Sequence, residues 1–584
     1  MKLKLAVLAA ALAGAHAFGE YKDEQKPLAV TIHGAGFRSV LEGAAVARAL
    51  GDRLREVTHL GGASGGSWFG ALMLYSPDFY SAVIDPDKPI EDVVAEWGAQ
   101  YGQTMIDASA GFNPADPGLS GPPAWATEQP KGFELPIGPG GADICAGFNA
   151  GYNQLTAGFL TAPPLALQFP PWNWLSFINA LLKDSIDGFS TLRTTNAPTT
   201  GLAAALVVHA ALGPDAYLTP PTSSANAAFR TYDYDGTAPP YNLVIPVAHS
   251  VPAGGGGDWV VNAKISSLAV DGSALLTPNP TLLELLAGAS AFLGNAGGPT
   301  WLQTTLAFTG QLPFLAPPDG PVLDPTPGKP GYPAYELASA CKPFGLQVAA
   351  SPLLKDGYTF PPDGPQTPAD LAKVSENARY RLADGGFLEN TGAAPAIAAM
   401  QKDCAEGKLD CSGPLKIIIV DQLDQTEGSF RLFDFENQPP ANEYYQYPYA
   451  FDATVASQQI FAEAPPEPSA FQSYKMNTYP FAYFQGPIGI GFELPGFPPF
   501  TRSAESTYWH GRATTVTNDW YGVQAGSDVE ILILNTALGT DGGVPTVVGG
   551  GFAKDAFAQL YGPLAKSQAD GMAPIVTAFL AGTL

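Results

Sequence analysis

The apolar positions of residues 27–75 change from one spacing to another in a regular order. Residues 28–32 form a short apolar run that is typical of a buried strand. Between residues 38 and 57 the apolar positions fall at helical spacing, residues 58–60 form a second short strand, and residues 67–75 are again helical. This order predicts two parallel strands, each followed by a helix.

A second patterned region covers residues 376–425. It contains two strand-like runs, residues 380–383 and 415–420, and residues 393–401 between them have helical spacing. A late strand is expected over residues 529–534. Because strands alternate with helices in both regions, the chain is predicted to have an α/β core.

Residues 76–375, between the two regions, are much less regular. The chain holds 65 glycines and 56 prolines, and Pro- and Gly-rich stretches separate short helical patterns in this segment. We interpret it as a cap or insertion. Residues 18–584 are then a single domain, whose core comes from residues 27–75 and 376–425.

The first 17 residues have the features of a secretory signal peptide. Lys2 and Lys4 precede an apolar run over residues 5–14, and residues 15–17 (Ala-His-Ala) offer a cleavage site between small residues. No later apolar run approaches the roughly 20 residues that span a bilayer, so no transmembrane segment is expected. The protein is predicted to be secreted or to lie in an endomembrane lumen, such as a vacuole or lysosome.

The net charge bears on the protein's partners, and the cysteines bear on its compartment and on metal binding. A formal net charge of −25 disfavours binding to nucleic acid. The four cysteines suit an oxidising compartment: Cys404 and Cys411 can close a small loop, and Cys145 would then pair with Cys341, one of three possible pairings. Their spacing is not that of a zinc site, and neither a metal nor a cofactor is expected.

Ser64 lies in a G-x-S-x-G pattern, Gly62-Ala63-Ser64-Gly65-Gly66, between a predicted strand and a predicted helix. A nucleophilic serine requires such a sharp turn, and the helix N-terminus offers unpaired N–H groups, that of Gly65 included, to a developing oxyanion. The pattern alone is weak because a glycine-rich chain produces it by chance. Its place between strand and helix makes Ser64 a candidate nucleophile.

A second glycine loop, residues 33–38, also separates a strand from a helix. The backbone N–H groups of Gly34, Ala35 and Gly36 can form an oxyanion hole. The loop is similar to the H-G-G-G loop of α/β-hydrolase esterases, but only 28 positions (64 − 36) separate Gly36 from Ser64. This leaves room for one helix and one strand, so the two loops should follow neighbouring parallel strands.

The two loops and their spacing resemble the catalytic domain of the cytosolic phospholipase A2 and lysophospholipase (phospholipase B) family, with patatin as a more distant relative. These enzymes use a Ser–Asp dyad without histidine, and the aspartate lies in an Asp-Gly-Gly or Asp-Ser-Gly turn. Residues 384–386 (Asp-Gly-Gly) have that form. The resemblance implies a three-layer α/β core with a central, mostly parallel sheet, a Ser64–Asp384 dyad and a large cap.

On this resemblance, Ser64 is the nucleophile and Asp384 the general base of an acyl-ester hydrolase. Arg38 would bind the substrate phosphate, and Asn390 matches a polar residue that follows the turn in the lysophospholipases. Ala35 departs from the family's all-glycine loop. The expected substrate is a (lyso)phospholipid met at a membrane or micelle interface; no C2-like calcium-binding domain is recognised.

Several alternatives remain open. Ser64, Asp384 and His510 follow the chain order of an α/β-hydrolase triad, which would make the protein an esterase or lipase.

Arg38 could pair with a carboxylate, because a cation at a helix N-terminus opposes the helix dipole. Asp421, after a strand, is expected at a sheet edge or behind the site. A catalytically inactive lipid-binding protein is a further reading, and head group, acyl position and oligomeric state stay open.

Overall fold

The protein is described from a computed structural model of the chain. It describes residues 25–110, 178–214 (without 180), 245–262, 279–290, 380–421 (without 388), 429, 432–433, 459–463, 477–490 (without 484, 487 and 488), 500–518, 521–536 and 561–584. The predicted signal peptide, Cys145, Cys341 and most of the predicted cap lie outside these residues.

Among the described residues, five parallel strands form the centre of a 10-stranded sheet, in the order β3-β2-β1-β7-β12. Most of their side chains are buried and apolar, as is typical of parallel strands that are covered on both faces. The strands are β1 (Leu28–Ile32), β2 (His59–Ala63), β3 (Ala205–Pro214), β7 (Leu415–Asp421) and β12 (Asp528–Asn535).

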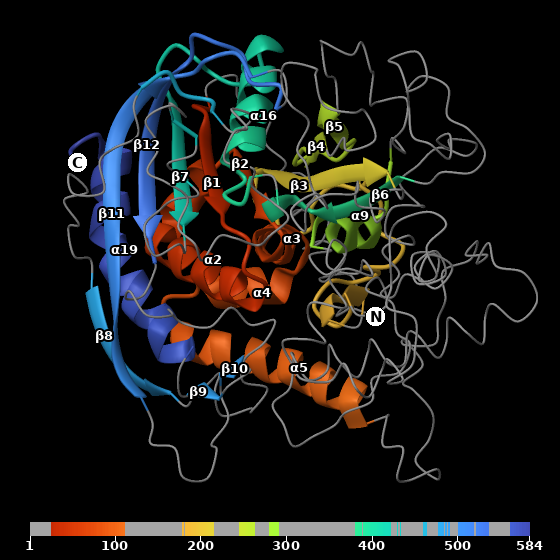
Figure 1. Ribbon diagram of the computed structural model, residues 1–584, viewed down its shortest axis with the longest axis vertical. Helices are drawn as coiled ribbons and strands as arrows, with labels where there is room; N and C mark the ends of the chain where they lie inside the picture. Colours follow the sequence, from red (N-terminus) through yellow and green to blue (C-terminus); the bar gives the residue numbers. More distant parts are fainter. Residues whose placement is uncertain are drawn as a thin grey trace, which may run out of the picture.

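Antiparallel strands extend this centre on both sides (Figure 1). On the β12 side lie β11 (Phe500–Thr514) and β8 (Asn477–Tyr483), and on the β3 side lie β4 (Ile245–Val251) and β5 (Asp258–Asn262). The tenth strand, β6 (Tyr380–Asp384), pairs antiparallel with β3. Strands β9 (Gln485–Gly486) and β10 (Gly489–Ile490) pair antiparallel in a separate two-stranded sheet.

Helices cover the two faces of the sheet. Gly70 of α3 faces the Leu206 side chain, whereas Asp403 of α16 contacts His59. Leu60 pairs with Leu206, so it shares that residue's face, and His59 next to it points the opposite way. Helices α3 and α16 therefore lie on opposite faces, and Figure 1 shows α16 apart from the group formed by α2, α3 and α4.

The described helices have the following bounds: α2 Phe37–Leu50, α3 Gly65–Tyr75, α4 Pro77–Ile84, α5 Ile90–Ala110, α9 Leu282–Ala289, α16 Ala393–Ala405 and α19 Gly562–Ala581, with 3₁₀ turns η1 (Gly51–Glu56) and η8 (Gly385–Phe387). Helix α19 packs against α2 and α5. No helix among the described residues is both long and apolar enough to cross a membrane.

The predicted α/β core with a central parallel sheet is confirmed, and so is the Cys404–Cys411 disulfide, which closes a loop after α16. The strand–helix–strand order over residues 376–425 does not form a parallel pair of strands. Strand β6 runs antiparallel to β3, and hence to β7. The local pattern of apolar residues specifies a strand but not its direction, which is set by pairing with β3.

Candidate functional site

Ser64 and Asp384 meet because two strands approach each other along one edge of β3. The first half of β3 pairs with β2, so that Ala63 lies opposite His209. The second half pairs with β6, which arrives from the opposite direction and places Asp384 opposite Ala210 (Figure 1). His209 and Ala210 are consecutive, so the ends of β2 and β6 lie next to each other. Ser64, which follows Ala63, is therefore close to Asp384.

Ser64 occupies a strained turn between β2 and α3. Its φ of 49° and ψ of −122° make it the only non-glycine residue with positive φ in the described part of the chain. Gly62 and Gly66 lie so close to the carbonyl oxygen of Ile32 that a Cβ at either position would overlap it. Strain of this kind at a strand-to-helix turn is typical of serine nucleophiles, because it exposes Oγ at the helix N-terminus.

Asp384 is buried beside Ser64. The Ser64 hydroxyl lies close enough to the Asp384 carboxyl group to act on its pKa, and the N–H of Gly386 donates to Asp384 Oδ1 at 2.8 Å. Burial raises the pKa of Asp384 to about 7, although Ser64 and the Gly386 N–H both act to lower it. A carboxylate with a pKa near neutrality, in contact with a serine hydroxyl, can accept a proton from it.

The loop before α2 lies against the Ser64 turn. The N–H of Gly34 donates to the Asn390 carbonyl oxygen at 3.0 Å, and the N–H of Ala35 donates to Ser39 Oγ at 2.6 Å. A Cβ on Gly65 would overlap the Gly36 carbonyl oxygen, so these two glycine backbones are in direct contact. Of the four N–H groups predicted to bind an oxyanion, those of Gly34 and Ala35 thus already have acceptors.

Asn390 joins the two loops. Its Nδ2 donates to the Gly34 carbonyl oxygen at 3.2 Å and lies 2.6 Å from His33 Nε2. Asp421, fully buried at the end of β7, accepts hydrogen bonds from the N–H and Oγ of Ser429 and lies 3.9 Å from His33 Nε2. Because β7 is a central strand, Asp421 stands behind the site rather than at a sheet edge.

Arg38 forms a buried ion pair. Its Nε donates to Glu42 Oε1 at 3.0 Å, and Nη2 donates to the Thr536 carbonyl oxygen at 3.3 Å. Both side chains of the pair are buried, and Gln568 Nε2 also contacts Glu42. Desolvation raises the pKa of Glu42, while Arg38 acts to lower it. The structure thus shows the carboxylate pairing; the phosphate role of Arg38 stays a prediction.

His510 lies away from Ser64. It is on β11, four strands along the sheet from β2, and four spacings of about 4.8 Å amount to roughly 19 Å. Its Nε2 lies 3.3 Å from Glu530 Oε1 on the neighbouring strand. Ser64, Asp384 and His510 therefore have the chain order of a catalytic triad, but His510 is too far from Ser64 to act in one.

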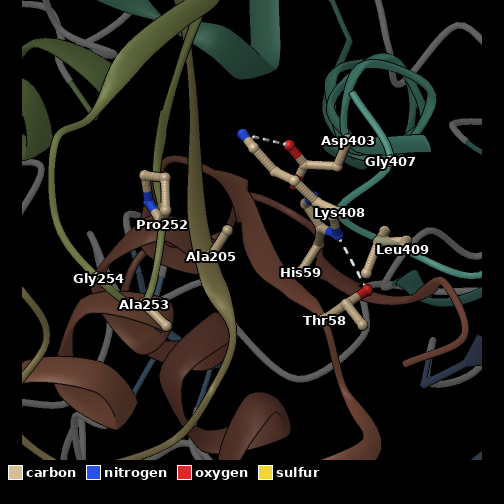
Figure 2. A pocket seen from close by; sticks show the side chains of 10 residues that line it. All are labelled: Thr58, His59, Ala205, Pro252, Ala253, Gly254, Asp403, Gly407, Lys408 and Leu409. Atoms are coloured by element: carbon tan, nitrogen blue, oxygen red, sulfur yellow. Dashed lines mark hydrogen bonds and ion pairs between the residues drawn. The ribbon is translucent and has the colours of Figure 1, made fainter. Parts of the chain in front are cut away.

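A cavity of about 340 Å³ lies at the other end of the sheet from Ser64, near the first residues of β2 and β3 (Figure 2). His59 Nδ1 lies 3.0 Å from Thr58 Oγ1, and His59 Nε2 lies 3.2 Å from Asp403 Oδ2. Lys408 Nζ is 3.1 Å from the other oxygen of Asp403. The histidine, carboxyl and ammonium groups of this cavity thus pair with one another or with Thr58.

Two buried residues of the site were missed at the sequence level. Glu389 accepts hydrogen bonds from the N–H groups of Thr391 and Ala394 at the start of α16, and burial raises its pKa to about 7. His209 Nδ1 lies 3.0 Å from the Glu389 carbonyl oxygen. The sequence signal for His209 is that it is the single polar residue in the apolar run 206–212.

Comparisons with known proteins give a distant likeness among solved structures. No family model and no curated protein sequence matches the chain. Among solved structures, human GIVD cytosolic phospholipase A2 is similar with 12% sequence identity and a TM-score of 0.38. The match covers 96% of this chain and 63% of that chain, so this chain spans less than two thirds of that structure's length.

Proposed function

We propose that the protein is a serine acyl-ester hydrolase that releases fatty acids from (lyso)phospholipids through Ser64 and Asp384. The observation that carries the proposal is the contact between the two side chains. A serine on a strained strand-to-helix turn lies beside a buried carboxyl group whose pKa is about 7. A base is most useful when its pKa lies near the working pH.

The reaction would proceed in two steps. Ser64 Oγ attacks the ester carbonyl carbon while its proton passes to Asp384, and the resulting oxyanion collapses to an acyl-enzyme. Asp384 returns the proton to the departing alcohol oxygen. In the second step Asp384 takes a proton from water, which attacks the acyl carbon, and Asp384 then gives that proton to Ser64 Oγ as the Oγ–acyl bond breaks and the fatty acid leaves.

Gly36 and Gly65 are the N–H donors that we assign to the oxyanion. Gly65 lies at the N-terminus of α3, next to the nucleophile, and its backbone touches that of Gly36. The N–H groups of Gly34 and Ala35 would then hold the shape of the loop through Asn390 and Ser39. Donors aimed at the developing negative charge are worth about 2.7–4 kcal/mol each in known hydrolases.

The lipid substrate rests on the sequence resemblance, as does action at a membrane or micelle interface, and secretion rests on the signal-peptide features of the first 17 residues. The same resemblance places Arg38 on the substrate phosphate, whereas its buried pairing with Glu42 favours a structural role. The inactive lipid-binding alternative is disfavoured because Ser64 and Asp384 are both present and in contact.

The proposal is tested by labelling and by substrate. A fluorophosphonate probe should label the wild-type protein at Ser64, as located by peptide mass spectrometry. Fatty-acid release should be measured on lysophospholipids, diacyl phospholipids, galactolipids and triglycerides, with release from the first two expected to be fastest. Lipid binding without labelling or release would instead support an inactive lipid-binding protein, and a preference for triglycerides would contradict the phospholipid substrate.

The rate of hydrolysis should depend on pH through Asp384. Because the base must be ionised and its pKa in the free protein is about 7, kcat/KM is expected to fall as the pH drops below about 7, by roughly tenfold per pH unit. The measurement is a kcat/KM profile between pH 4 and 9. Glu389→Gln is the matched control, since that carboxyl group has a similarly raised pKa. If this variant lost the acidic limb of the profile, Asp384 would not be the titrating base.

A further inference from the structure

His209 lies under the junction between the two strand ends. It pairs with Ala63, the residue before Ser64, and is followed by Ala210, which pairs with Asp384. Its side chain is fully buried. A Cβ added to Gly385 would lie 2.9 Å from His209 Nδ1, so the imidazole ring directly supports the first glycine after Asp384.

A chain of hydrogen bonds leads from His209 to the Asp384 carboxyl group. His209 Nδ1 lies 3.0 Å from the Glu389 carbonyl oxygen. The N–H of Glu389 donates to the Gly385 carbonyl oxygen at 3.1 Å, and the N–H of Gly386 donates to Asp384 Oδ1 at 2.8 Å. The His209 side chain, on β3, thus contacts the turn that carries Asp384.

The protonation state of His209 follows from its partner. A carbonyl oxygen can only accept a hydrogen bond, so Nδ1 carries the proton. Burial lowers the pKa of His209 to about 4, which keeps the ring neutral at physiological pH. Its Nε2 has no hydrogen-bond partner among the described residues, and the ring packs edge-on against Tyr521 at 5.9 Å between centroids. His209 therefore stands next to Ser64 and Asp384 without a hydrogen bond to either side chain.

We propose that His209 is a positioning residue, whose Nδ1–H fixes the 384–389 turn so that the Asp384 carboxyl group stays on Ser64. The proposal rests on the proposed hydrolase function. It assigns His209 no proton transfer, in contrast to the histidine of a Ser-His-Asp triad. Reacting groups need positioning to a fraction of an ångström, since a displacement of about 1 Å can lower a rate about 100-fold.

Two nearly isosteric substitutions test the proposal. In His209→Asn the amide Nδ2 can occupy the place of Nδ1 and donate to the Glu389 carbonyl oxygen. In His209→Gln the amide lies one carbon further out, near the place of Nε2. We expect kcat per fluorophosphonate-titrated serine to stay within about threefold of wild type in the asparagine variant, and to fall about 100-fold in the glutamine variant, with KM nearly unchanged in both.

His249→Gln is the control for loss of a buried histidine. His249 lies on β4 and pairs with Val208, so it points to the opposite face of the sheet from His209. The kcat of the His249→Gln variant, per titrated serine, should match that of the wild type. Equal kcat values in His209→Asn and His209→Gln would overturn the proposal, whether both were high or both were low. An inactive, unlabelled wild-type protein would instead contradict the hydrolase function itself.

Discussion

Ser64→Ala is expected to lower kcat for ester hydrolysis by a factor on the order of 10⁴ or more, and Asp384→Asn to have a similar effect. Without Ser64 no acyl-enzyme can form, and asparagine cannot accept the serine proton. Because the two residues would act as one unit, the double variant should be no slower than the slower single variant. The measurement is kcat on a lysophospholipid for the three variants, with folding checked by circular dichroism.

Ser81→Ala is a suitable control, because Ser81 is an exposed serine of α4, away from the strand ends. It should keep wild-type activity. If the reductions of kcat in the two single variants were additive in the double variant, Ser64 and Asp384 would act independently. Normal hydrolysis by Ser64→Ala would remove the proposed mechanism altogether.

Arg38→Ala is expected to lower the free energy of unfolding by about 3–5 kcal/mol. The substitution leaves the Glu42 carboxylate buried without its ion-pair partner, and it removes the hydrogen bond to the Thr536 carbonyl oxygen. Glu42→Gln in the same background should recover part of the loss, because it removes the unpaired charge. Urea or guanidinium unfolding at pH 7 measures both effects.

Arg53→Ala is the matched control. Arg53 pairs with Glu56 at 2.8 Å, but the two side chains are 34% and 47% exposed, so the loss should be about 1 kcal/mol or less. The phosphate role predicted for Arg38 leads to a different result. In that case Arg38→Ala would raise KM for phospholipids but not for triglycerides, and stability would hardly change.

The nucleophile side of the site could be predicted because its information is local. Apolar spacing specifies β1, α2, β2 and α3, and the glycines around residue 64 mark the sharp turn. The 28 positions between Gly36 and Ser64 leave room for one helix and one strand only. The two loops therefore had to lie side by side, as they do.

The pairing of Arg38 with Glu42 is also local, because residues four apart share one face of a helix. The sequence nevertheless left two partners open for Arg38. Burial decided between them: a charge at this position is covered by the end of β12 and by α19, which lie about 500 residues further along the chain.

What the sequence determined by itself is a strand, a strained serine turn and a helix, together with an Asp-Gly-Gly turn elsewhere in the chain. The tertiary structure alone decided that these turns meet. Asp384 reaches Ser64 because β6 runs antiparallel along the edge of β3 that β2 leaves free. His209 supports the Asp384 turn through the Glu389 carbonyl oxygen, 180 positions away. Strand direction and buried polar contacts depend on pairing between distant segments, and apolar spacing carries no information on either.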